Sequence, residues 1–249
     1  MNKNPSIKRI RYGYLPLMIN KCVSKLPNRY LFLLLIVFLP FLFACHYTPK
    51  NELPDPMRFA GEIELIKNKT FSKDKERIVF TGSSSIRMWK DISAYYPEHQ
   101  IINSGFGGAE MSDLLFHLDH TVLQFAPAKV FIYGGDNDVG SGRSISLVLE
   151  QAEEIAETIE SKFPDCQIIF ISAKPSVLRW YLNSTYEKFN QELEVLASKN
   201  SNRRYVNIWD VMLNDRRTVN PSLFIRDGLH MNKAGYDIWG QAIRPFVEG

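Results

Sequence analysis

The chain has 249 residues, which is enough for one mid-sized domain and an appendage. Its apolar fraction of 45% and charged fraction of 23% are typical of a globular protein. The formal charge of +3 comes from residues 1–44, which hold seven basic and no acidic residues; the rest has 23 basic against 27 acidic. This excludes the strongly basic surface that nucleic-acid binding requires.

The first 45 residues resemble a bacterial lipoprotein export signal. A basic stretch precedes the apolar residues 31–43, and Pro40 interrupts this apolar segment. The segment is shorter than the roughly 20 apolar residues that a transmembrane helix needs. Ala44 before Cys45 resembles a lipobox, which implies cleavage and lipidation at Cys45. Two alternatives stay open: an uncleaved signal anchor, and a true translation start at Met18.

Residues 46–56 are rich in proline and polar residues and predict an extended tether. Beyond them, helical and strand patterns alternate. The expected helices are 57–68, 85–96, 111–125, 144–163, 179–199 and 232–247, and the expected strands are 77–81, 100–102, 129–133, 167–172 and 204–209.

This alternation predicts one α/β domain over residues 57–249, a three-layer α/β/α sandwich around a five-stranded parallel sheet. The expected strands are apolar on both faces, as in a sheet that helices cover on both sides. Such sheets bind ligands at the carboxyl ends of their strands.

Four short motifs lie after expected strands or in a late loop. They are Gly-Ser-Ser-Ser at 82–85, Asn-Ser-Gly-Phe-Gly-Gly at 103–108, Gly-Asp-Asn-Asp at 135–138 and Asp-Gly-Leu-His at 227–230. A serine needs a neighbouring base to become a nucleophile, a carboxylate orients that base, and N–H donors stabilise an oxyanion. Singly the motifs have plain structural explanations, namely a helix cap, a tight βα turn, an Asx turn or cation site, and a structural loop. Their joint occurrence favours one serine-hydrolase site.

These motifs resemble the four blocks of the SGNH, or GDSL-like, hydrolase superfamily over residues 76–247, which implies its flavodoxin-like fold. The resemblance implies Ser84 as nucleophile, with Asp227 and His230 completing the triad. It implies an oxyanion hole formed by the N–H groups of Ser84 and Gly108 and the side chain of Asn137, with Gly107 as the second candidate for the glycine. An α/β-hydrolase is less consistent, because no glycine follows Ser84 as in Gly-x-Ser-x-Gly.

One position departs from the family pattern: Ser83 stands where the family usually has Asp. We expect Ser83 to hydrogen-bond neighbouring loops without bringing a charge. Phe106, Arg179 and Trp180 are candidates to line the substrate site, although Trp180 packing on the following helix is an equal alternative.

No cysteine and histidine spacing predicts a metal site, and the mechanism needs no cofactor. His117 and His120 are expected to be exposed helix residues rather than ligands. Cys166 is expected to be a small buried apolar residue.

The expected function is a serine esterase that acts on small-molecule or glycan esters, with short acyl or O-acetyl groups favoured because no long apolar lid is evident. The expected location is the bacterial envelope, with the outer membrane preferred and a membrane contact through the lipid anchor. The alternatives are a non-catalytic glycan-binding lipoprotein and an acyltransferase.

Overall fold

The computed structural model describes residues 53–72 and 74–249. The expected signal, Cys45, Met18 and most of the tether therefore lie outside the described residues. The 3₁₀ helix η2 (Pro56–Phe59) begins at the last tether position, and the Asp55 side chain caps it by accepting from the N–H of Met57.

A five-stranded sheet runs through the domain. Its strands are β1 (Arg77–Gly82), β2 (Gln100–Asn103), β3 (Lys129–Tyr133), β4 (Gln167–Ile171) and β5 (Arg203–Val206). Their order is β2-β1-β3-β4-β5, and every neighbouring pair is parallel. This is the flavodoxin-like order, with a switch point between β1 and β3 where ligands bind beyond the strand ends. The predicted three-layer α/β/α fold is confirmed.

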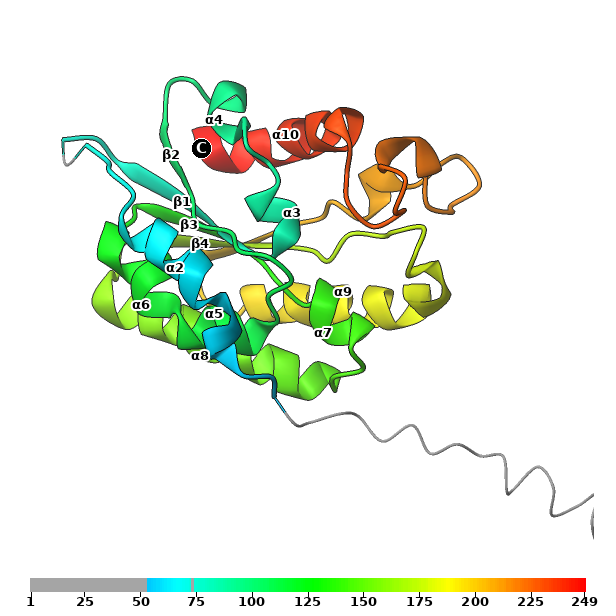
Figure 1. The fold of residues 1–249 in the computed structure, drawn as a ribbon, viewed down its shortest axis with the longest axis horizontal. Coiled ribbons are helices and arrows are strands. Elements are labelled where there is room, and N and C mark those ends of the chain that lie inside the picture. The colour runs from blue at the N-terminus through cyan, green and yellow to red at the C-terminus, as the bar shows by residue number, and fades with distance from the viewer. Residues whose placement is uncertain (1–52, 73) are drawn as a thin grey trace, which may run out of the picture. The chain divides into compact units, whose positions relative to one another are not determined.

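Helices cover both faces of the sheet (Figure 1). One layer holds α3 (Ser84–Arg87), α4 (Ile92–Tyr95) and α10 (Lys233–Glu248). The other holds α2 (Ala60–Lys67), α5 (Met111–Phe116), α6 (Leu118–Thr121), α8 (Ile145–Lys162) and α9 (Asn183–Ala197). A short helix, α7 (Asp136–Gly140), follows β3, and further 3₁₀ turns are η3 (Leu123–Phe125), η4 (Trp180–Leu182), η5 (Asp210–Met212) and η6 (Pro221–Leu223).

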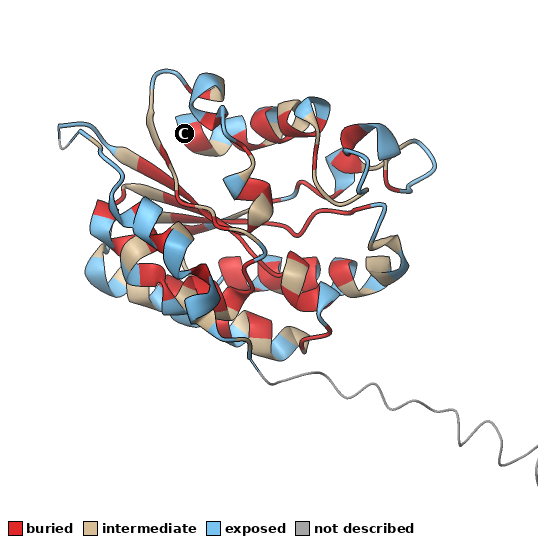
Figure 2. Ribbon diagram, in the orientation of Figure 1, coloured by how far each residue is buried: buried red, intermediate tan, exposed pale blue. Residues whose placement is uncertain are grey.

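Each face of the sheet has its own buried cluster, and the central strands β1, β3 and β4 are buried beyond their first residue (Figure 2). Beneath α10 the cluster is aromatic: Phe80 and Phe131 stack 4.3 Å apart across β1 and β3, and Trp89 lies against Trp239 of α10. This two-sided burial explains the continuous apolar runs of the strands. Within the described ranges, no helix is long and apolar enough to cross a bilayer.

Candidate active site

The three consecutive serines lie where β1 leads into α3. Ser83 and Ser85 are buried, whereas Ser84, the first residue of α3, is only partly so. The Ser84 hydroxyl oxygen is 3.0 Å from Nε2 of His230. Of the three serines, Ser84 alone combines access to solvent with contact to a base.

The loop between η6 and α10 carries Asp227 and His230. One Asp227 oxygen, Oδ1, accepts the backbone N–H groups of Leu229 and His230 at 2.8 and 2.9 Å, and the other, Oδ2, is 2.7 Å from Nδ1 of His230. Burial opposes ionisation, but these hydrogen bonds outweigh it and lower the pKa of Asp227 to about 2. The ionised carboxylate accepts the proton of Nδ1, so Nε2 presents its lone pair to the hydroxyl of Ser84.

The glycine turn after β2 contains one occupied and one available backbone donor. The N–H of Gly107 donates to the Glu62 carboxylate at 3.1 Å. In the described ranges, 53–72 and 74–249, no acceptor faces the N–H of Gly108 or of Ser84. Gly108 has a left-handed φ of 67°, and a β-carbon there would meet nothing within 4 Å. Of the two glycines weighed from the sequence, Gly108 has the N–H that a ligand can reach.

Asn137 lies in α7, directly beyond β3. Its amide nitrogen donates to the carbonyl of Ala109 at 2.9 Å, and its oxygen accepts from Arg179 at 3.2 Å. An amide nitrogen carries two hydrogens, so one stays available to a ligand. The other hydrogen, bonded to Ala109, joins the Asn137 side chain to the residue that follows the glycine turn.

The neighbouring Asp138 holds two segments of the site together. Its carboxyl oxygens accept the N–H groups of Met111 at 2.9 Å and Gly135 at 3.2 Å. Complete burial raises the pKa of Asp138 to about 7, against the lowering effect of these bonds. Sequence reasoning missed this link and the contact of Glu62, whose helix carries no catalytic motif.

Three expectations for single residues are wrong. Phe106 does not rim the site: the N–H of Phe106 donates to the carbonyl of Gly82, and its fully buried ring packs on Phe59 at 5.1 Å. The Ser83 hydroxyl is buried and has no hydrogen-bond partner in the described part of the chain. His117 is buried rather than exposed, and its Nε2 donates to the carbonyl of Pro56 at 2.9 Å.

The remaining expectations concern residues that precede or follow β4 in the chain. Arg179 donates to Asp136 and Asn137. Trp180 is partly buried, and its ring stacks on Trp209, which follows β5 rather than lying in the following helix, with the ring centres 6.0 Å apart. Cys166 is a buried free cysteine, as expected, and burial raises the pKa of its thiol to about 12.

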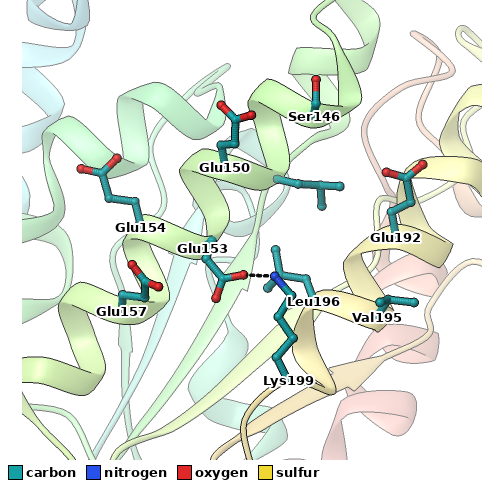
Figure 3. Close-up of a pocket in the computed structure, with 10 residues that line it drawn as sticks. Ser146, Glu150, Glu153, Glu154, Glu157, Glu192, Val195, Leu196 and Lys199 are labelled. Atoms are coloured by element: carbon teal, nitrogen blue, oxygen red, sulfur yellow. Dashed lines mark hydrogen bonds and ion pairs between the residues drawn. The ribbon is translucent and has the colours of Figure 1, made fainter.

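A cavity of about 760 Å³ lies away from these residues, between α8 and α9 (Figure 3). Glutamates dominate its lining, and Glu153 there pairs with Lys199. No residue of the four motifs lines this cavity, so it does not belong to the candidate active site.

Comparisons with known proteins identify the same family. The model of the GDSL-like lipase/acylhydrolase family matches residues 80–238. No curated protein matches the sequence.

Solved structures share the fold. A Streptococcus pneumoniae protein, provisionally described as a platelet activating factor, has 23% identity and a TM-score of 0.67 over 76% of this chain and 94% of its own. A GDSL-like lipase from Bacteroides thetaiotaomicron has 22% identity and a TM-score of 0.64 over 78% and 97%. A variant of an acetyl-xylooligosaccharide esterase from Geobacillus stearothermophilus has 18% identity and a TM-score of 0.56 over 68% and 93%.

The family model covers more than half of the chain, including the serine turn, the glycine turn and the Gly-Asp-Asn-Asp motif. The strand order and the solved structures agree with it. This chain therefore belongs to the GDSL-like lipase/acylhydrolase family and is a carboxylic ester hydrolase.

Proposed function

We propose that the protein is a serine esterase in which Ser84, His230 and Asp227 form the catalytic triad. The observation that carries this proposal is the continuous hydrogen-bond chain from Ser84 Oγ to His230 Nε2 at 3.0 Å and from His230 Nδ1 to Asp227 at 2.7 Å. A nucleophile, a base and a carboxylate that orients the base are the three parts that acyl transfer to a serine requires.

In the first step His230 accepts the proton of the Ser84 hydroxyl as Oγ attacks the ester carbonyl. The tetrahedral intermediate collapses when His230 returns this proton to the leaving alkoxide, which departs as the alcohol and leaves an acyl-Ser84 ester. His230 then takes a proton from water, whose oxygen attacks the acyl carbonyl. Protonation of Ser84 Oγ releases the carboxylic acid and restores the enzyme.

The negative charge on the carbonyl oxygen is stabilised by the N–H groups of Ser84 and Gly108 and by the amide of Asn137. The two backbone N–H groups have no other acceptor in the described residues, and the Asn137 amide has one hydrogen to spare. Donors that are held in place before the reaction stabilise the transition state without having to reorganise.

The proposed substrates are esters of short acyl groups, with O-acetyl groups on carbohydrate favoured. The sequence contains no long apolar insertion between the strands that would cover a long acyl chain. The structural similarity to an acetyl-xylooligosaccharide esterase also supports a carbohydrate ester. We further propose that Cys45 anchors the mature protein in the bacterial cell envelope, with the outer membrane favoured because His46 follows it rather than Asp.

The experiment compares p-nitrophenyl esters of graded chain length and an acetylated xylooligosaccharide as substrates. Ser84→Ala is measured beside Ser83→Ala, a matched control whose hydroxyl has no hydrogen-bond partner among the described residues. We expect acetyl esters to be the best substrates and activity to be lost in Ser84→Ala alone. A rate that rises with chain length would contradict the short-acyl assignment, and the absence of turnover on every ester would favour the glycan-binding alternative.

A further inference from the structure

A buried ion cluster lies directly beneath Asn137. At its centre is the Asp136 carboxylate, which is almost inaccessible to solvent. Two cations contact it: Lys174 Nζ at 2.9 Å and Arg179 Nη1 at 2.7 Å. The Tyr133 hydroxyl donates to it at 3.0 Å, and the Tyr186 hydroxyl donates to the backbone oxygen of Asp136 at 2.8 Å and lies 3.2 Å from the carboxylate.

This cluster carries a net positive charge. Burial disfavours the ionised form of Asp136, but Lys174 and Arg179 outweigh burial and hold its pKa below the usual range. Burial raises the pKa of both tyrosines, so they stay neutral. One carboxylate facing two cations leaves this cluster with one excess positive charge, next to the Asn137 side chain that Arg179 contacts.

Arg179 connects this cluster to Asn137. Its Nη1 donates to Asp136, to the backbone oxygen at 3.0 Å and to Oδ1 at 2.7 Å, while its Nη2 donates to Oδ1 of Asn137 at 3.2 Å. The guanidinium also lies against Gly140, where an added β-carbon would approach its central carbon to 2.8 Å. A planar guanidinium held on two sides has one orientation, and that orientation is transmitted to Asn137.

The Asn137 amide is consequently fixed at both ends, because the carbonyl of Ala109 accepts one amide hydrogen at 2.9 Å. An asparagine amide without such partners can flip, which exchanges its donor and acceptor. With Oδ1 occupied by Arg179, the nitrogen must face the glycine turn.

We propose that Arg179 is a positioning residue for the oxyanion hole, which it serves by holding the amide of Asn137 in its donating orientation. This inference rests on the proposed function. It replaces the expectation that Arg179 lines the substrate site, and it assigns the cluster beneath Asn137 a role in catalysis beyond folding.

The test is a double-mutant cycle between Arg179→Lys and Asn137→Ala, with p-nitrophenyl acetate as substrate. Lysine keeps the charge but has a single ammonium group, which cannot bridge Asp136 and Asn137 as the fork of arginine does. Removing one oxyanion donor costs about 10²–10³-fold in kcat. We expect Arg179→Lys to lower kcat about 10–100-fold with KM within about twofold, as for an interaction made in the transition state. In the Asn137→Ala background the same change should lower kcat less than about threefold, because coupled residues are not additive.

Arg203→Lys is the matched control. Arg203 is also a buried arginine, paired with Glu153 and Glu160, and within the described part of the chain its side chain has no hydrogen bond or ion pair with a motif residue. We expect it to lose stability and keep its kcat. Thermal unfolding is measured for every variant, and Arg179→Gln is added in case Arg179→Lys does not fold.

Equal losses from Arg179→Lys in both backgrounds would overturn the inference, as would a raised KM at constant kcat, which indicates substrate binding. Ser84→Ala distinguishes failure of the proposed catalytic triad from failure of the positioning role of Arg179. If Ser84→Ala is inactive while the Arg179 and Asn137 effects are additive, only the positioning role fails. If Ser84→Ala is fully active, the proposed function and this inference fail together.

Discussion

Asp227→Asn changes one group of the proposed triad while leaving its surroundings intact. Oδ1 of Asp227 accepts the N–H groups of Leu229 and His230, so the asparagine must place its oxygen there. Its NH₂ group then faces Nδ1 of His230, which has to accept a hydrogen bond. The imidazole proton moves to Nε2, 3.0 Å from Ser84, and the nitrogen that should take the serine proton already carries one.

We expect this wrong tautomer to lower kcat by about 10⁴-fold, the loss typical of this change in a serine triad, which corresponds to about 5 kcal/mol of transition-state stabilisation. The Asp227 side chain is 42% exposed, so the free energy of unfolding should change by less than about 1 kcal/mol. The assay is hydrolysis of p-nitrophenyl acetate with urea unfolding alongside. Asp227→Ala, which leaves both tautomers accessible, should lose less activity than Asp227→Asn. An Asn variant within tenfold of wild type would refute this reasoning.

Other predictions concern stability. Because the pKa of Asp138 is raised to about 7, its stabilising effect is complete below pH 4 and is lost as the pH rises through 7. The free energy of unfolding relative to Asp138→Asn, from urea titrations, should therefore fall by up to about 1.4 kcal/mol per pH unit between pH 4 and 7; a constant difference would contradict this. Gly108→Ala should lower the free energy of unfolding only by the backbone strain of about 1–2 kcal/mol. Gly135→Ala should lower it clearly more, as measured by thermal unfolding, since its β-carbon would lie 2.3 Å from the ring of Phe189. Equal losses in the two variants would argue against this packing. Ser83→Ala should leave the free energy of unfolding unchanged or higher, because it removes a buried hydroxyl that has no hydrogen-bond partner among residues 53–72 and 74–249. A loss above about 1 kcal/mol would show that this hydroxyl does make a hydrogen bond.

The strands were the most predictable part of the fold. The expected strand 129–133 coincides with β3, because strands buried on both faces are short apolar runs, and Pro127 and Gly134 mark the two ends of this one. The order of motifs along the chain also placed Ser84 and His230 at one edge of the sheet, since parallel strands end together there.

Helix interruptions could not be predicted, because tertiary contacts cause them. The pattern over 85–96 predicted one helix, but the structure has α3 and α4 with a break between them. Asn103, at the end of β2, donates to the carbonyls of Ile86 and Trp89 at the break. The Gly-Asp-Asn-Asp motif, for which an Asx turn was one of the plain structural explanations, lies at the start of the helix α7, where the Asp138 carboxyl accepts the N–H of Gly135.

Contacts between residues that are far apart in the chain could not be predicted from the sequence either. Glu62 reaches Gly107 across 45 positions and Arg179 reaches Asn137 across 42, and neither pair follows a local periodicity. The motifs thus predicted which groups would react, whereas the groups that hold them in place became visible only in the folded chain.

The central claim is that Ser84 is the residue that carries the acyl group. The most direct measurement is reaction with a fluorophosphonate, followed by mass spectrometric mapping of the adduct among Ser83, Ser84 and Ser85. We predict a single adduct on Ser84 that is absent from His230→Ala, because the hydroxyl oxygen requires the base 3.0 Å away. An adduct on Ser83 or Ser85, or equal labelling of Ser84 without His230, would contradict the proposed triad.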